Sequence, residues 1–220
     1  MDKKKLVHVL DTPYSAVSWP QISNDDQDAI LELLCHLLAP IGVHRAAHIV
    51  PSKGKRSKKE PPSDRPPAPA IAAHVDVGLA NISRNLQNLD STGGQPYSVV
   101  FVARSGQSSA FNCHFPQMVG VASSSTPSAP AIRLVSFSKP CEERLSAVLG
   151  IPRVSCIALR EGAPQAKGLV DYVREHAEPV DVAWLEQARK GEHQETKINA
   201  VSTKVGTARA KRPMPSHSEP

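Results

Sequence analysis

Long apolar runs are absent from this sequence of 220 residues. A membrane-spanning helix needs about 18 to 20 predominantly apolar residues, and no uninterrupted run approaches that length. Near the N-terminus, the apolar stretch extends only from Leu6 to Leu10 and contains His8, which is too short for a secretory signal. We therefore expect no membrane partner and a chain that works in the nucleus or the cytoplasm.

Cysteines and aromatic residues are also scarce. Aromatic residues make up only 4% of the chain, so we expect no aromatic platform for stacked bases. We interpret the cysteines as small buried side chains in a reducing compartment, with disulfides or a zinc site as the alternatives. They form no C-x-x-C pair and lie far apart, at Cys35, Cys113, Cys141 and Cys156.

Catalytic motifs are missing as well. The sequence contains no dinucleotide-binding glycine motif, no phosphate-binding loop, no G-x-S-x-G and no H-E-x-x-H. His44 and His48 have helical spacing but no neighbouring carboxylate or cysteine to complete a metal site, so surface or RNA-contacting histidines are the simpler interpretation. Cys113 and His114 are read as a packing pair, because no third group would orient them. We expect no catalytic residues, no metal and no cofactor.

Helical and strand patterns alternate through the middle of the sequence. A helix should begin at Asn24, after which Pro40 and Gly42 should end it. Strands are predicted at 71–78, 97–105, 131–137 and 154–160, and further helices at 80–89, 115–122, 142–150 and 166–176. This order predicts an α/β fold, a three-layer α/β/α sandwich.

The pattern also divides the chain into parts. The sandwich should span residues 24–185, after an N-terminal arm of residues 1–23. A basic and proline-rich insertion at 51–70 should interrupt it. Residues 190–220 lack hydrophobic periodicity, so this basic tail is predicted to be disordered.

Positive charge is concentrated between Pro40 and Lys59, in a chain with a net charge of +5. This stretch contains no Asp or Glu, and its Ser, Gly and Lys residues offer hydroxyls, N–H groups and ammonium groups to phosphates. We predict that it binds RNA backbone, with a solvated loop or a nuclear import signal as the alternative. The candidate residues are Arg45, Lys53, Lys55, Arg56, Lys58 and Lys59.

Two shorter motifs are further candidates. Gly78 ends a predicted strand, and Asn81 and Arg84 follow at the start of a helix, where phosphates or base edges can bind. The alternative is that Asn81 and Ser83 only cap the helix. The second motif is GIPRV, a loop between a helix and a strand whose candidate residues are Ile151, Pro152 and Arg153.

Taken together, these motifs resemble the kink-turn-binding ribosomal-protein superfamily. Four segments resemble, more narrowly, the fungal Pop-three subunit family shared by ribonuclease P and ribonuclease MRP: PIGVHRAAHIVPSKGKRSKK, HVDVGLANISRNL, YSVVFVAR and RLSAVLGIPRVSCIALREGAP. The resemblance covers about residues 24–185. It implies a four-stranded mixed sheet between helices, and binding of a helix–internal loop–helix or kink-turn-like RNA element.

The resemblance also assigns roles to individual residues. The superfamily's RNA-reading helix begins with glycine, a small or apolar residue and then asparagine; here Gly78 and Leu79 match, whereas Ala80 takes the asparagine position. Asn81 would then substitute for that asparagine, or affinity would depend more on the basic insertion and on neighbouring proteins. Arg84 keeps the basic position, and the GIPRV loop lies where the superfamily presents an apolar surface to a flipped-out nucleotide.

The function implied is that of a non-catalytic, RNA-binding subunit of ribonuclease P and ribonuclease MRP. Its partners would be the two RNAs and the other protein subunits, and its work would support tRNA and rRNA processing in the nucleus and nucleolus. In such particles the RNA, with magnesium, carries the phosphodiester chemistry. The alternatives are a ribosomal or small nucleolar kink-turn-binding protein, or an α/β adaptor whose basic loop is only an import signal.

Overall fold

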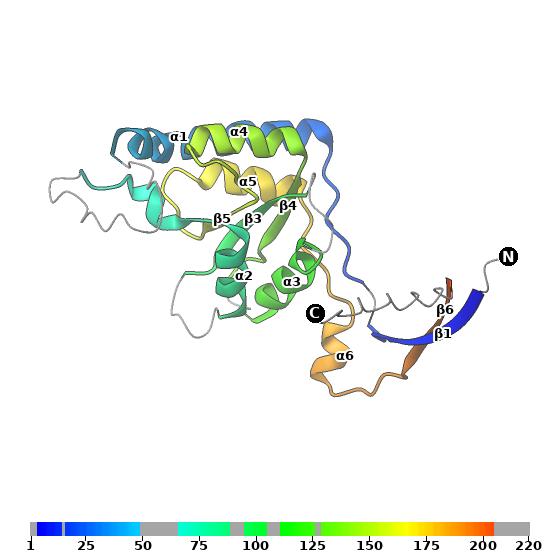
Figure 1. Cartoon of the computed structure of the whole chain (residues 1–220). Helices are drawn as coiled ribbons and strands as arrows, with labels where there is room; N and C mark the ends of the chain where they lie inside the picture. Colours follow the sequence, from blue (N-terminus) through cyan, green and yellow to red (C-terminus); the bar gives the residue numbers. More distant parts are fainter. Residues whose placement is uncertain are drawn as a thin grey trace, which may run out of the picture. The chain divides into compact units, whose positions relative to one another are not determined.

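The computed structural model describes residues 4–14, 16–48, 66–88, 95–104, 111–125 and 129–204 (Figure 1). It divides the chain into two compact units. One unit consists of residues 16–185, and the other combines residues 1–15 with residues 186–220. We describe each unit by itself.

A four-stranded mixed sheet forms the centre of the larger unit. Its strands are β2 (Val75–Val77), β3 (Tyr97–Ala103), β4 (Arg133–Phe137) and β5 (Cys156–Arg160), in the order β2-β5-β3-β4. β3 pairs in parallel with β4, whereas β5 is antiparallel to both β2 and β3. Every residue of β3 is buried, as expected for a continuous apolar strand covered on both faces.

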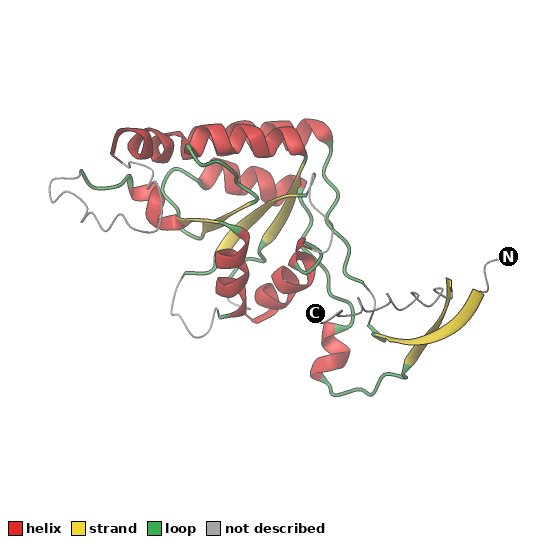
Figure 2. Ribbon diagram, viewed as in Figure 1, coloured by secondary structure: helices red, strands yellow, loops and turns green. Residues whose placement is uncertain are grey.

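Helices cover both faces of this sheet (Figure 2). α1 (Asn24–His48), α4 (Lys139–Leu149) and α5 (Lys167–His176) pack on one face, and α2 (Leu79–Gln87) and α3 (Phe115–Ser125) on the other. A short 3-10 helix, η1 (Ala70–His74), precedes β2; after α5 the chain continues into α6 (Leu185–Arg189), which belongs to the second unit from residue 186 onward. The predicted α/β sandwich with a four-stranded mixed sheet is confirmed.

Two predicted elements differ from the structure by more than a few residues. The strand predicted at 71–78 is confined to β2, because η1 occupies the preceding residues. The first helix was predicted to end at Pro40 and Gly42, but α1 continues through both to His48. Pro40 removes one helical hydrogen bond, but the turn that follows it packs the buried Gly42 against α4.

Gly42 has a packing role rather than a terminating one. A Cβ atom built at Gly42 would lie 1.8 Å from the carbonyl oxygen of Val148 in α4. The glycine therefore lets α1 and α4 approach closely.

α1 is the one helix among the described residues with the length and hydropathy of a membrane span. Its apolar side chains, among them Ile30, Leu34 and Leu38, are buried in the core of this unit, so we interpret it as a core helix.

The second unit contains a two-stranded antiparallel ribbon. It consists of β1 (Lys4–Asp11) and β6 (Lys197–Lys204). The prediction of disorder after Lys190 is therefore wrong for β6. Residues 198, 201 and 203 are β-branched, which favours a strand, but the pairing partner lies at the opposite end of the sequence, where a local pattern cannot reveal it.

Candidate nucleic-acid interface

The candidate motifs meet at one end of the four-stranded sheet. β2, β3 and β4 finish at this end and β5 begins there, as their registers require. The backbone N–H of Gly78 donates to the carbonyl of Cys156, and that of Ala103 donates to Ser155, both at 2.9 Å. The start of α2 and the loop before β5 therefore lie side by side, and we call this region the candidate end.

Gly78 sets the direction in which α2 leaves β2. Its φ is 103°, a conformation that favours glycine over residues with a Cβ atom. Gly78 is also the N-cap of α2, and no side chain caps the helix there. The N–H groups of the first turn have no carbonyl partner within the helix, so they are available to an external acceptor.

Asn81 and Arg84 project from the exposed face of α2, while Ile82 and Leu86 are buried beneath them. The Asn81 amide donates to Oδ1 of Asp76 over 3.4 Å. The capping alternative is thus wrong for Asn81, because Gly78 holds the N-cap position. Ser83 instead links two helices, since its Oγ lies 3.1 Å from Nε2 of His114 beside α3.

The GIPRV loop is held in shape by α4. Gly150 ends α4 in the left-handed conformation with φ of 62°, and the Ser146 hydroxyl accepts from the N–H of Val154 at 3.0 Å. Pro152 and Arg153 are exposed. Nε of Arg153 donates to Oε1 of Glu142 at 3.0 Å, yet the arginine side chain keeps 59% of its surface exposed.

An apolar cavity of about 380 Å³ joins this loop to the end of α1. Arg45 lies at this cavity, which places one residue of the basic segment within the described structure. Its buried Nε has no hydrogen-bond partner in the structure described here. The cavity lining includes Ile41, His44, Arg45, Val77, Leu149 and Ile151.

The other basic candidates cannot be placed in the same way. Lys53, Lys55, Arg56, Lys58 and Lys59 lie outside the described residues.

The two histidines near the end of α1, His44 and His48, have ring centroids 5.0 Å apart, and Nε2 of His44 lies 3.1 Å from the carbonyl of Pro66. Across the described ranges, no group of three His, Cys, Asp or Glu side chains is placed to hold a metal ion.

Sequence reasoning overlooked one arginine at the candidate end. Arg104 immediately follows β3, and its guanidinium carbon lies 4.5 Å from the ring centroid of Trp19. A cation over an aromatic face is held in place by electrostatic attraction. A basic residue directly after a buried strand was a visible signal for Arg104, but nothing local connected it to Trp19.

The cysteine expectation holds for three of the four residues. Cys35, Cys141 and Cys156 are buried, and burial raises the pKa of the Cys156 thiol. Cys113 is instead exposed. The sequence predicts that Cys113 packs with His114; in the structure the His114 ring packs against Phe115, with ring centroids 4.7 Å apart.

A different polar cluster lies toward the opposite end of the sheet. Oδ2 of Asp76 accepts from the Tyr97 hydroxyl at 2.6 Å, from Nη2 of Arg160 at 2.6 Å and from the Asn85 amide at 3.3 Å. Asn85 also donates to the Tyr97 hydroxyl at 2.9 Å. Burial and the hydrogen bond to Asp76 raise the pKa of Tyr97. We call these four side chains the closed network; the other oxygen of Asp76, Oδ1, also accepts from the exposed Asn81 amide.

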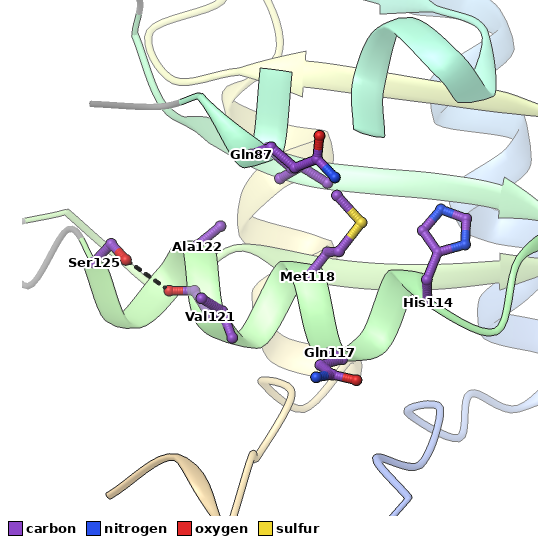
Figure 3. Close-up of a pocket in the computed structure, with 8 residues that line it drawn as sticks. Gln87, His114, Gln117, Met118, Val121, Ala122 and Ser125 are labelled. Atoms are coloured by element: carbon purple, nitrogen blue, oxygen red, sulfur yellow. Dashed lines mark hydrogen bonds between the residues drawn. The ribbon is translucent and has the colours of Figure 1, made fainter. Parts of the chain in front are cut away.

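A second cavity, of about 540 Å³, lies between α2 and α3 (Figure 3). Met118 projects from α3 toward Gln87, and His114 stands at the start of the same helix. The described residues that line it include no lysine or arginine. This cavity therefore adds nothing to the cationic surface of the candidate end.

Comparison with known proteins tests the family directly. The family model described as RNase P subunit Pop3 matches residues 63–187, more than half of the chain. The match includes the start of α2 and the GIPRV loop. No curated protein matches the chain. Membership in this family implies a protein component of a nuclear ribonucleoprotein that works with RNase P RNA and other subunits in tRNA processing. The chain therefore belongs to the RNase P subunit Pop3 family.

Proposed function

We propose that the chain binds the catalytic RNA of ribonuclease P, and that of ribonuclease MRP, through the candidate end of its sheet. The observation that carries this proposal is the juxtaposition of the α2 start with the GIPRV loop, through the hydrogen bond from Gly78 to Cys156. Donors for base edges and phosphates thus lie beside an apolar loop. A bent RNA with an extruded base needs both kinds of surface.

Each part of the candidate end has a distinct role in this proposal. The uncapped first turn of α2 and Asn81 face base edges or phosphates, and Arg84, Arg104 and Arg153 supply positive charge. Ile151 and Pro152 form the wall for an extruded nucleotide, beside the cavity that Ile151 lines. The kink-turn is the RNA shape that fits this arrangement, with Asn81 substituting for the asparagine that Ala80 replaces.

The basic segment adds affinity that does not depend on sequence. Lys53, Lys55, Arg56, Lys58 and Lys59 follow α1, whose last turn already carries Arg45. Lysines and arginines in such a segment neutralise phosphates and release counterions. In this proposal the protein folds and positions the RNA, which carries the cleavage chemistry, in tRNA processing and in nucleolar rRNA processing.

Sequencing the RNA that copurifies with the full chain tests the proposal. We expect ribonuclease P RNA and ribonuclease MRP RNA with the unchanged chain, and a reduced yield of both with Arg84→Ala combined with Arg153→Ala. The matched control is Lys167→Ala, which removes an exposed charge from the start of α5. Recovery of ribosomal or small nucleolar RNA, or equal recovery with all variants, would contradict the proposal.

A further inference from the structure

The β1–β6 ribbon exposes apolar side chains on both of its faces. Leu6, Leu10 and Ile198 are 58%, 74% and 60% exposed, and they share one face because residues two apart in a strand point the same way. Val9 and Val201 are exposed on the other face. An isolated two-stranded ribbon is marginally stable in water. Within the described residues, neither strand pairs with a third strand.

Charge is distributed unevenly along this ribbon. At one end, Asp11 lies opposite Lys197 in the register. Its Oδ2 is 3.3 Å from the lysine Nζ, so the two opposite charges at this end cancel. At the other end Lys4 lies opposite Lys204, and Lys5 is the next residue along β1. The five register pairs from Leu6 to Leu10 between these ends contain no lysine or arginine.

We propose that this ribbon binds an extended segment of a neighbouring protein subunit, which adds as a strand to one free edge. The segment would alternate apolar residues over the centre of the ribbon and carry acidic residues where it meets Lys4, Lys5 and Lys204. Strand addition satisfies the backbone groups of the edge, and alternate side chains of the added strand cover the apolar face. The inference rests on family membership, which implies other protein subunits, and not on the proposed RNA contacts.

The charge pattern favours a protein over RNA. RNA carries a negative charge at every nucleotide, whereas the central five pairs, about 16 Å long, offer mainly aliphatic side chains, with His8, Asn199 and Ser202 as the polar ones. RNA lying along this stretch would lose phosphate hydration without gaining cations. Phenylalanine, tyrosine and tryptophan, the main side chains on which single-stranded bases stack, are absent from β1 and β6.

Crosslinking in the assembled particle tests the proposal. A photoreactive amino acid at Leu10 of the full chain is irradiated in particles purified through their RNA, and the crosslinked products are identified by mass spectrometry. We expect a peptide from another protein subunit, with apolar residues in alternation and acidic residues to one side. Crosslinks mainly to RNA, or to a second copy of this chain, would overturn the proposal.

The crosslinked peptide, once synthesised, provides the binding probe. Lys4→Glu combined with Lys5→Glu should weaken its binding to the full chain at least about tenfold, because charge reversal at the cationic end replaces attraction with repulsion. Lys190→Glu, outside the ribbon, is the matched control, and affinity for ribonuclease P RNA should change little in either variant. Equal peptide affinity for both variants would overturn the ribbon proposal, whereas a failure of RNA binding at the candidate end would leave it standing.

Discussion

The two ends of the four-stranded sheet carry similar residue types in opposite arrangements. Toward the opposite end, Asp76, Asn85, Tyr97 and Arg160 bind one another in a closed network. At the candidate end, Asn81, Arg84, Arg104 and Arg153 are exposed. A single helix, α2, contributes an asparagine to each arrangement. Both asparagines donate to Asp76, but Asn85 is half-buried and also donates to Tyr97, whereas Asn81 is exposed and its bond is 3.4 Å long. Exposure and the number of partners, rather than residue type, therefore separate a structural polar group from a binding one.

The largest expected effect on stability comes from substituting Asp76, because the other three members of the closed network all donate to it. Asp76→Ala should lower the free energy of unfolding by about 2–4 kcal/mol, because Tyr97 and Arg160 both lose a charged partner in a largely buried site. Denaturant unfolding of the full chain measures this change. RNA affinity of the variant, measured where it remains folded, should fall no further than that of Asn81→Ala, because Asp76 also accepts from the Asn81 amide; a larger loss of RNA affinity in a stable variant would contradict the comparison.

The complementary change removes charge from the candidate end. Arg84→Ala and Arg153→Ala should each weaken RNA binding about tenfold, because each removes a charged contact to RNA. Each lost phosphate contact should also lower the slope of log affinity against log salt by about 0.7–0.9. Combined, the two effects should be non-additive if both arginines bind one RNA element.

Titrations of RNA at several salt concentrations provide the measurement. Thermal unfolding should be almost unchanged in both variants, since surface substitutions usually alter stability by less than about 0.5 kcal/mol. Lys167→Ala is again the control for loss of one exposed charge. An equally large loss of RNA affinity in this control would show that the net charge of the protein, rather than the candidate end, determines RNA binding.

The two asparagines of α2 offer a matched pair with a smaller effect. Asn85→Ala should lower the free energy of unfolding by about 1–2 kcal/mol and leave RNA affinity alone, because its amide donates to Asp76 and Tyr97. Asn81→Ala should do the reverse, with a several-fold loss of affinity and little change in stability. Measuring the free energy of unfolding and the RNA affinity of both variants distinguishes the structural asparagine from the RNA-binding one. A stability loss without an affinity loss at Asn81 would make that residue structural.

The smallest effect concerns alkaline pH. The pKa of Tyr97 is raised by burial and by its hydrogen bond to Asp76, so the fold favours the neutral phenol. Its contribution to stability is complete below the unfolded-state pKa of about 10 and declines as the pH rises toward the folded-state value. Unfolding measured across this range should show a steeper loss for the unchanged chain than for Tyr97→Phe. Parallel pH profiles would exclude this role for Tyr97.

The sequence predicted the layers of the sandwich well because their apolar patterns are local. The buried run of β3 and the spacing of Ile82 and Leu86 on α2 are examples. The family resemblance also assigned RNA-contacting roles to the GIPRV loop and the α2 start, which the fold brings side by side. The resemblance to the Pop-three subunit family is confirmed by the family match.

Features that depend on distant partners were not predictable in this way. α1 continues past Pro40 because its packing on α4 and on the sheet outweighs one lost hydrogen bond. β6 forms because β1 supplies its pairing partner. The amide of Asn81 reaches back to Asp76, and Arg104 lies over Trp19, contacts that no local pattern reveals.

Site-specific photocrosslinking to RNA tests the central claim most directly. One photoreactive amino acid is placed at Ala80, exposed at the start of α2, and in a second full-length chain at Lys167, exposed at the start of α5 toward the opposite end of the sheet. With ribonuclease P RNA bound, we predict strong crosslinking from Ala80 and weak crosslinking from Lys167. Equal crosslinking from the two positions, or stronger crosslinking from Lys167, would contradict RNA binding at the candidate end.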